Sequence, residues 1–129
     1  ACPKALSIAD FWADELSNLA QRSGLLRPTT AYVAASYVCR TRNHMAGARL
    51  SEHSFGRAID IRAIDFEQGG TWSVQPREDE DDSPGATFQA AFREAACGPF
   101  KTVLGPGSDG FHQDHIHMDN APRSSTYCR

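Results

Sequence analysis

Two short segments of this 129-residue chain hold four of its five histidines, and they constrain the fold more than any other feature. The first segment, residues 51–60, reads SEHSFGRAID, and the second, residues 112–119, reads HQDHIHMD. Histidine is the commonest metal ligand in proteins and titrates near neutral pH, and such clustering is difficult to attribute to packing. We therefore expect a fold that brings these two segments of the chain together.

The spacing inside each segment suits a metal site. His115 and His117 are two residues apart, so they point to the same face if they lie on a strand. His53 is expected in a loop and Asp60 in the strand that follows, with Gly56 allowing the backbone to turn between them. Two imidazoles and one carboxylate form a three-ligand set with one open position, which is typical of catalytic zinc. A single histidine would be better interpreted as a solvated surface residue, but the cluster favours a metal.

The charge balance gives no sign of a nucleic-acid partner. Thirteen Lys and Arg face sixteen Asp and Glu, and the formal net charge is −3. Five of the acids fall in residues 78–82, and without that run the balance would be slightly basic. There is thus no basic field to recruit nucleic acid and no charge excess typical of membrane-surface binding.

The length and composition indicate one folded unit. A chain of 129 residues with 40% hydrophobic residues can bury one moderate core, and disorder is excluded by this composition. No apolar stretch approaches the length of a transmembrane helix. We expect residues 1–129 to form a single domain that acts as a monomer, in either a mature or a trimmed form of the protein.

Four cysteines, Cys2, Cys39, Cys97 and Cys128, indicate an oxidising compartment. None belongs to a CxxC pair, which argues against a thiolate zinc ribbon, and an even count favours two disulfides over free thiols in a cytosolic protein. Three pairings are possible. We expect Cys97–Cys128, because Cys97 ends a predicted helix and Cys128 lies in a tail that would otherwise fray, and Cys2–Cys39 by remainder.

The apolar periodicity predicts an α+β fold, in which helices flank a small, mainly antiparallel sheet. The first helix is expected over residues 7–23 with Ser7 as its N-cap, and the second begins at residues 83–84 and ends at residues 98–99. The strands are expected over residues 31–39, 57–66, 100–104 and 115–118, the first of them buried. Within the loop of residues 67–84, Trp72 and Val74 could form a further short strand.

The motif segments resemble a known group of zinc peptidases. SEHSFGRAID matches the SxHxxGxAxD motif of the D-Ala-D-Ala metallopeptidases and their relatives, the LAS superfamily, which includes lysostaphin-type peptidases, murein endopeptidases and the hedgehog fold. More closely, the chain resembles the extensin-like C-terminal domain family of bacteria. This resemblance rests on YVCR, RN, LSEH, AID, C..F.TVLGP, H.DHIHMD and the terminal YCR, and it extends over nearly the whole chain. It implies an LAS-type metallopeptidase fold.

The resemblance implies a zinc site and extra active-site histidines. His53 and Asp60 match the first two zinc ligands of the superfamily, and His117 matches the third. His115 and His112 stand two and five residues before that third ligand, as additional active-site histidines do in the murein endopeptidases.

The general base is not decided by the resemblance. Asp114 stands where the carboxypeptidase branch carries a glutamate base, but here it is an aspartate followed by His115. If residues 114–117 form a regular strand, Asp114 faces away from His115 and His117. That geometry favours His115 as the base or as a partner of the oxyanion, and Asp114 as a residue that orients the site from behind, whereas a bulge would reverse the assignment.

Three further residues are expected at the substrate. Ser51 would stand behind the metal ligands and beside the substrate, and Arg40 or Arg42 would clamp a substrate carboxylate.

The function implied is zinc-dependent hydrolysis of an amide bond in the stem peptides or cross-links of peptidoglycan, with a D,D- or L,D-endopeptidase favoured. The location implied is the bacterial periplasm or the exterior. A D,D-carboxypeptidase and a catalytically inactive, zinc-stabilised cell-wall binding module are the alternatives. A structural protein of the plant extensin type is excluded, because seven scattered prolines form no repeat.

Overall fold

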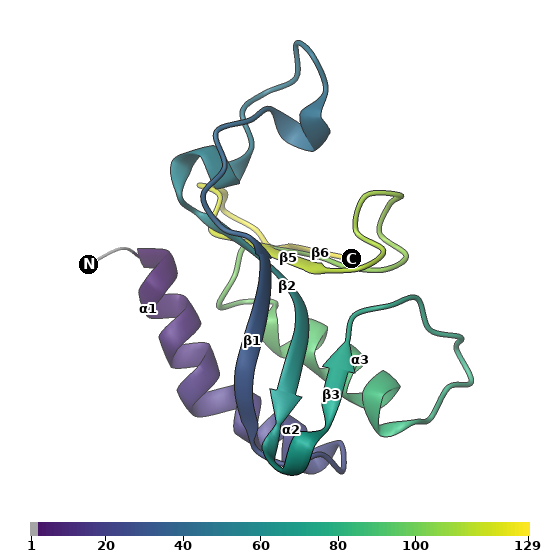
Figure 1. Cartoon of the computed structure of the whole chain (residues 1–129). Helices are drawn as coiled ribbons and strands as arrows, with labels where there is room; N and C mark the ends of the chain where they lie inside the picture. The colour runs from purple at the N-terminus through teal and green to yellow at the C-terminus, as the bar shows by residue number, and fades with distance from the viewer. Residues whose placement is uncertain (1–2) are drawn as a thin grey trace.

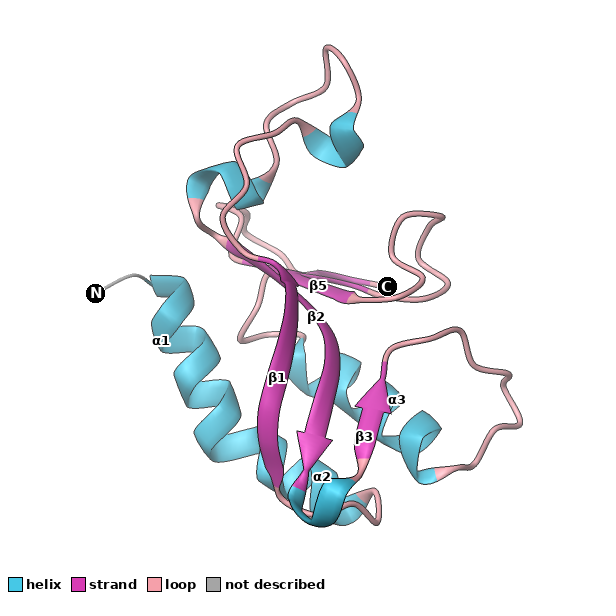
Figure 2. Ribbon diagram, viewed as in Figure 1, coloured by secondary structure: helices cyan, strands magenta, loops and turns pink. Residues whose placement is uncertain are grey.

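The computed structural model describes residues 3–129, which form an α+β fold with a mostly antiparallel sheet, as expected (Figures 1 and 2). The sheet has the order β1-β2-β5-β4-β6, and β3 pairs with β2 beside this path. All strand pairs are antiparallel except β4 with β6. The strands are β1 (Pro28–Ala35), β2 (Ala58–Phe66), β3 (Thr71–Ser73), β4 (Thr102–Leu104), β5 (Ile116–Asp119) and β6 (Tyr127–Cys128).

The long strand β2 organises the sheet. Along one edge it pairs with β1, and along the other edge it pairs first with β5 and then with β3. Its sequence alternates apolar and polar residues, the period of a strand, and the expected span of residues 57–66 is confirmed. The expected strands at 100–104 and 115–118 are present at Thr102–Leu104 and Ile116–Asp119, differing only at their ends. β3 carries the buried Trp72, so the short strand considered for the 67–84 loop is also confirmed.

The helices pack against one face of the sheet. At the N-terminus α1 (Pro3–Asp10) continues through a π-helical stretch (Phe11–Leu16) into α2 (Ser17–Arg22), and α3 spans Pro84–Ala96. Ser83 caps α3, because its hydroxyl accepts a hydrogen bond from the Ala86 N–H at 3.2 Å, and Pro84 occupies the first turn. The predicted second helix is therefore confirmed, including its N-cap.

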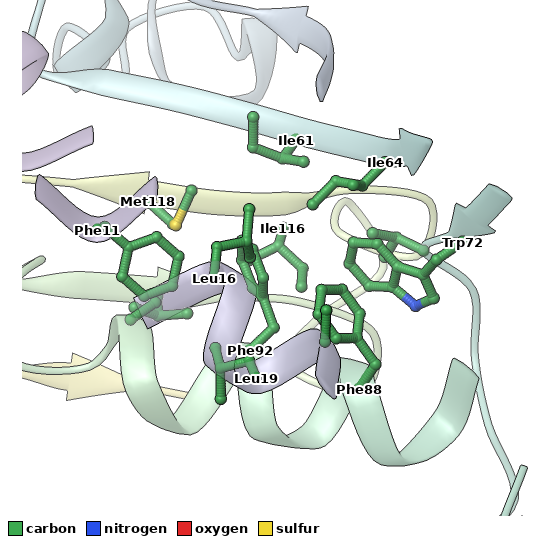
Figure 3. Packing of buried hydrophobic residues seen from close by; sticks show 14 of the residues in the cluster. Phe11, Leu16, Leu19, Ile61, Ile64, Trp72, Phe88, Phe92, Ile116 and Met118 are labelled. Atoms are coloured by element: carbon green, nitrogen blue, oxygen red, sulfur yellow. The ribbon is translucent and has the colours of Figure 1, made fainter. Parts of the chain in front are cut away.

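The core lies between these helices and the sheet (Figure 3). Aromatic side chains from the helices meet isoleucines and a methionine from β2 and β5, with Trp72 at one end. The Trp72 and Phe88 rings lie edge to face with centroids 4.8 Å apart, and those of Phe11 and Phe92 are 5.3 Å apart. In β5 and in the first half of β2, where the two strands pair, every second residue enters this core, so the residues between them face the other side of the sheet.

Two expected elements differ from the structure. The first helix begins at Pro3, so Ser7 lies inside it and accepts a hydrogen bond from the Asn120 amide rather than capping the helix. A proline is well suited to the first turn of a helix, because its missing N–H would have no partner there.

The predicted buried strand 31–39 is instead β1, Pro28–Ala35, and most of its residues are exposed. β1 is the edge strand, so Pro28 opens it without losing a ladder bond, and its outer face meets solvent. The chain leaves the sheet after Ala35. The short strand β6 was not expected, because two residues carry no periodicity.

The Cys97–Cys128 disulfide is confirmed, and it joins the end of α3 to β6. Cys39 is exposed and forms no disulfide with any residue of the 3–129 range. Cys2, and with it the expected Cys2–Cys39 pair, lies outside the described residues. Along the described chain no helix is both long enough and apolar enough to cross a membrane.

We predict that the Cys97→Ser, Cys128→Ser double variant loses about 3–4 kcal/mol of unfolding free energy, the chain-entropy value for cysteines 31 positions apart. Urea denaturation measures this loss. The control is Ser125→Ala, an exposed change in the same tail, which should stay within about 0.5 kcal/mol of the wild type. An unchanged midpoint in the double variant would show that the disulfide does not stabilise the fold.

Candidate metal centre

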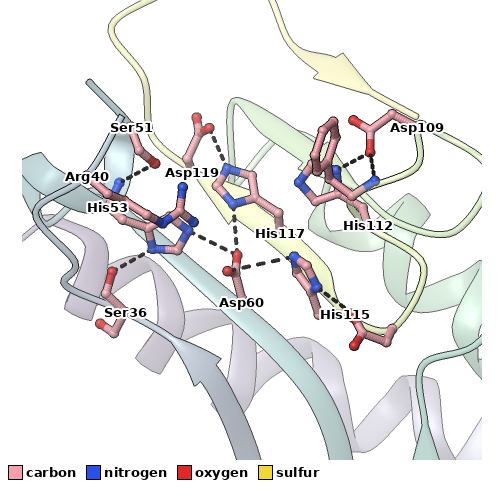
Figure 4. Close-up of polar contacts among 12 residues, drawn as sticks. Ser36, Arg40, Ser51, His53, Asp60, Asp109, His112, His115, His117 and Asp119 are labelled. Carbon is pink, nitrogen blue, oxygen red and sulfur yellow. Dashed lines mark hydrogen bonds and ion pairs between the residues drawn. The ribbon is translucent and has the colours of Figure 1, made fainter. Parts of the chain in front are cut away.

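Asp60 and His117 face each other across two central strands. They are direct partners in the register of β2 and β5, and the residues flanking them in sequence point into the core. Both side chains therefore emerge on the opposite face of the sheet, where His117 Nδ1 lies 2.8 Å from Asp60 Oδ1 (Figure 4). Both are buried.

His53 reaches the same point from the short 3-10 helix Glu52–Phe55, which precedes β2. Ser51 caps this helix by accepting a hydrogen bond from the His53 backbone N–H at 3.3 Å. Gly56 ends the helix with φ of 66°, a left-handed conformation that glycine adopts without strain. This turn explains why a glycine is needed between the loop histidine and Asp60.

The side chains of His53, Asp60 and His117 form a group that could hold a metal ion. One ligand atom from each lies within 4.8 Å of the others, and all three residues are buried. His53 Nε2 is 3.2 Å from Asp60 Oδ1. The two histidine segments are thus brought together as expected.

The hydrogen bonds of His53 leave the correct nitrogen free for a metal. Its Nδ1 lies 2.6 Å from the carbonyl oxygen of Ser36, and because a carbonyl only accepts, Nδ1 must carry the proton. Nε2 then presents a lone pair toward Asp60. This nitrogen is fully buried and makes no hydrogen bond within residues 3–129, a costly arrangement that a bound cation would relieve.

Asp119 fixes His117 in the same way. His117 Nε2 donates to Asp119 Oδ2 at 2.9 Å, so Nδ1 is the nitrogen left to face Asp60 and a metal. The backbone N–H of Ala121 holds the other Asp119 oxygen at 2.9 Å. A carboxylate behind a ligating histidine is a recurrent arrangement in metal sites, where it fixes the orientation of the ring and raises its basicity.

The metal-free centre stores a proton on His117. Burial alone lowers the pKa of His117, but hydrogen bonds to Asp119 and Asp60 outweigh it and raise the pKa to about 9. Burial likewise raises the pKa of Asp60, yet contacts from His117 and His53 hold it well below its usual value. At neutral pH an imidazolium therefore bridges two carboxylates, and a metal would take the place of its Nδ1 proton.

Two more histidines line the approach to this centre. His115 Nε2 is 3.7 Å from Asp60 Oδ2, and its Nδ1 lies 2.9 Å from Asp114 Oδ1. Asp114 is largely exposed, and this hydrogen bond lowers its pKa, so it is a carboxylate at neutral pH. His112 is buried, and its ring centroid is 5.1 Å from that of His115. The expected side-by-side placement of His115 and His117 is present.

His112 is held by an aspartate of its own. Its Nδ1 is 2.7 Å from Asp109 Oδ1. Burial lowers the pKa of His112, although Asp109 acts in the opposite direction.

A cleft of about 410 Å³ opens over the centre and contains the remaining predicted residues. Arg40 and Arg42 both line it, but Arg42 is 3.8 Å from Glu52, whereas the Arg40 guanidinium, within residues 3–129, donates to the Thr41 carbonyl oxygen alone. Ser51 also lines the cleft. Its hydroxyl is occupied by the His53 backbone, so its observed contact positions the metal group.

Sequence reasoning assigned no role to Asp119, Asp109 or the Ser36 carbonyl. Asp119 had a signal, because it stands two residues after His117 on the same strand and so on the same face. Asp109 lies three residues before His112, a weaker signal inside a loop. The Ser36 carbonyl has none, because any residue supplies a backbone oxygen.

Comparison with known proteins identifies the family. A family model described as the C-terminus of extensin-like protein matches residues 1–129. The chain belongs to this family. No curated protein and no solved structure gives a significant match. The match confirms the family that the motif segments indicated, and the candidate metal centre of this extensin-like domain lies wholly within it.

We predict that metal binding to the extensin-like domain releases about one proton at pH 7, because His117 is protonated below about pH 9. The affinity should rise about tenfold per pH unit until that pKa and then level off. Calorimetric titration with Zn²⁺ in two buffers of different ionisation enthalpy counts the proton.

Asp119→Asn is the matched variant for this titration. Removing the carboxylate lowers the pKa of His117, so fewer protons should be released at pH 7, and affinity should fall about 10–100-fold. An unchanged proton count would mean that another group supplies the proton.

We also predict that His53→Ala abolishes stoichiometric metal binding, measured by elemental analysis after loading and desalting. His44→Ala is the control, because His44 lines the same cleft but lies outside the ligand group. Full metal content in His53→Ala would refute the assignment of this ligand.

Proposed function

We propose that this extensin-like domain is a zinc-dependent peptidoglycan hydrolase of the LAS type, which cleaves an amide bond in stem peptides or cross-links. A D,D- or L,D-endopeptidase is favoured. The observation that carries the proposal is the buried His53, Asp60 and His117 group at the floor of an open cleft, with a second pair of histidines beside it. A cluster of buried ionisable side chains lining a cleft is typical of a reactive or metal-binding site, and this supports the proposal.

Zinc fits this donor set. Two imidazole nitrogens and one carboxylate oxygen are typical protein ligands of catalytic zinc, with one position left for water or substrate. The Ser36 carbonyl fixes His53 in the tautomer that presents its Nε2 lone pair inward, and Asp119 holds the His117 ring so that Nδ1 presents its lone pair inward once its proton is lost. The chemistry that zinc supplies when bound is the activation of water and the polarisation of a carbonyl group.

His115 is suited to be the general base. Its Nδ1–H donates to the Asp114 carboxylate, which leaves the Nε2 lone pair facing the metal group, 3.7 Å from Asp60 Oδ2. From there Nε2 could take a proton from an attacking water molecule and later deliver it to the leaving amine. Asp114 holds the ring and is exposed itself, which supports an orienting role over that of a base.

His112 and Arg40 complete the proposed site. His112 stands beside His115 and is buried, with a lowered pKa, so it is neutral at pH 7. Its Nδ1–H donates to the Asp109 carboxylate, which leaves Nε2 to accept a hydrogen bond from a substrate N–H. Arg40 is the better clamp for a substrate carboxylate, since Arg42 already faces Glu52.

The proposal includes a bacterial cell-wall substrate and a periplasmic or secreted location, and the disulfide is compatible with that location, because disulfides persist there. We propose that the domain works there as a monomer. A D,D-carboxypeptidase or an inactive zinc-stabilised binding module is the alternative, and the Asp114–His115 pair favours an enzyme, because a binding module has no use for an oriented base.

We predict that His115→Ala keeps its zinc and its fold but loses about 10²–10⁴ in turnover on a defined muropeptide, the usual contribution of acid–base catalysis. Asp114→Ala should lose only about 10–100-fold, as a change behind the reacting group. Both are compared with wild type at equal zinc content by mass spectrometry of the products. Ser125→Ala is the active control.

Two outcomes contradict this assignment. A larger loss in Asp114→Ala would make Asp114 the base, and full activity in both variants would move the active site elsewhere. If the zinc-loaded wild type cleaves no muropeptide, the binding-module alternative replaces the enzyme.

A further inference from the structure

The charged side chains of the cleft that have no ion-pair partner within residues 3–129 are positive, although the chain as a whole is acidic. Three carboxylates line the cleft, and each is already engaged: Asp60 and Asp119 by histidines, and Glu52 by Arg42 and by Arg57 at 3.1 Å. Of the arginines that line it, Arg40 and Arg123 have no carboxylate within ion-pair distance among residues 3–129. The cleft is therefore ready to receive negative charge at two places.

These two arginines lie in segments that adjoin the two opposite edge strands of the sheet. Arg40 lies in the segment that follows the edge strand β1, and Arg123 lies in the segment that leads into the other edge strand, β6. In the strand order, β2 and β5, which carry Asp60 and His117, lie between the edge strands β1 and β6. A ligand that crosses the sheet over the metal group would meet one arginine on each side.

The segment that carries Arg123 is firmly held. Its backbone is bonded at Asn120 to Arg57, and at Tyr127 to Lys101 at 2.8 Å, and β6 is tied to α3 by the disulfide. Such anchoring lowers the entropy that a ligand must remove on binding.

An aromatic ring lies beside the free arginine. Tyr127 lines the cleft and is 45% exposed, although its backbone is fixed in β6. The Arg123 guanidinium carbon is 5.9 Å from the centre of the Tyr127 ring. A guanidinium next to an exposed ring suits a ligand with a carboxylate attached to an aliphatic chain. The guanidinium pairs with the carboxylate, and the ring packs on the methylene groups.

We propose that Arg123 and Tyr127 form a second carboxylate subsite, on the side of the scissile amide opposite to Arg40. The inference rests on the proposed function and narrows it: the substrate carries a free carboxylate on both sides of the bond that is cleaved. Arg123 determines specificity by binding, and takes no part in the chemistry.

The test measures binding to the zinc-loaded His115→Ala protein, whose slow turnover preserves the ligand. The probes are a purified cross-linked muropeptide dimer and the same dimer with its peptide carboxylates amidated, titrated by calorimetry. We expect the free carboxylates to improve binding at least tenfold, as for hydrogen bonds between charged groups. Arg123→Gln should lose part of that preference, because Arg40 still pairs with the carboxylate on its own side.

Arg129→Gln is the matched control. Arg129 also lies beside the Tyr127 ring, at 5.3 Å, but it lines a separate hollow beside Cys97 and Cys128 rather than the cleft. Its substitution should leave the preference intact. An equal loss of preference in both variants would mean that the preference comes from the overall positive charge of this surface rather than from a subsite. The subsite would also be refuted if Arg123→Gln kept the full preference, or if the dimer did not bind at all.

Kinetics separates this inference from the proposed function. With zinc and an otherwise wild-type chain, Arg123→Gln should raise KM on the free-carboxylate dimer by about tenfold or more and change kcat little. If Arg123→Gln hydrolyses the dimer with an unchanged KM, the subsite is refuted but the proposed hydrolase activity is retained. A wild type that binds the dimer with the expected preference but never cleaves it would remove the hydrolase and leave the subsite.

Discussion

The contact between Asp60 and His117 is the constraint on which the rest of this structure depends. The two residues are direct partners in adjacent antiparallel strands, so the same alternation that sends Ile59, Ile61 and Met118 into the core turns the carboxylate and the imidazole to the opposite face. Burying a carboxylate there is costly unless positive charge compensates it. His117 supplies that charge in the metal-free state, and Asp119 supports it from behind.

In the metal-free centre a proton on His117 occupies a place where a metal ion could bind. Each imidazole has its outer nitrogen fixed by an acceptor, the Ser36 carbonyl or Asp119, and its inner nitrogen directed at Asp60. These acceptors come from loop and strand positions that the helices and the core hold in place. The protein thus orients its ligands before any metal arrives, which is how second-layer contacts raise metal affinity.

Sequence alone predicted the parts of the fold and site that strong local signals specify. Strand β2 alternates apolar and polar residues, and α3 has both a serine N-cap and a proline in its first turn. The predicted bounds of the edge strand β1 were wrong, because its exposed face weakens the apolar pattern of the strand. The predicted start of the first helix at Ser7 is wrong, because the helix begins at Pro3, a residue type that suits the first turn. The metal group followed from motif spacing, but the Ser36 carbonyl and the cleft position of Arg123 depend on tertiary contacts that no local pattern encodes.

The central claim is that His53, Asp60 and His117 bind one metal ion through the nitrogens that face Asp60. Anomalous diffraction at the zinc absorption edge, from crystals of the zinc-loaded protein, tests it most directly. The account predicts one strong peak bound by His53 Nε2, His117 Nδ1 and an Asp60 oxygen, with Zn–N distances of about 2.0–2.1 Å. A peak on His117 Nε2 beside Asp119, or a peak elsewhere with none between His53 and Asp60, would contradict it.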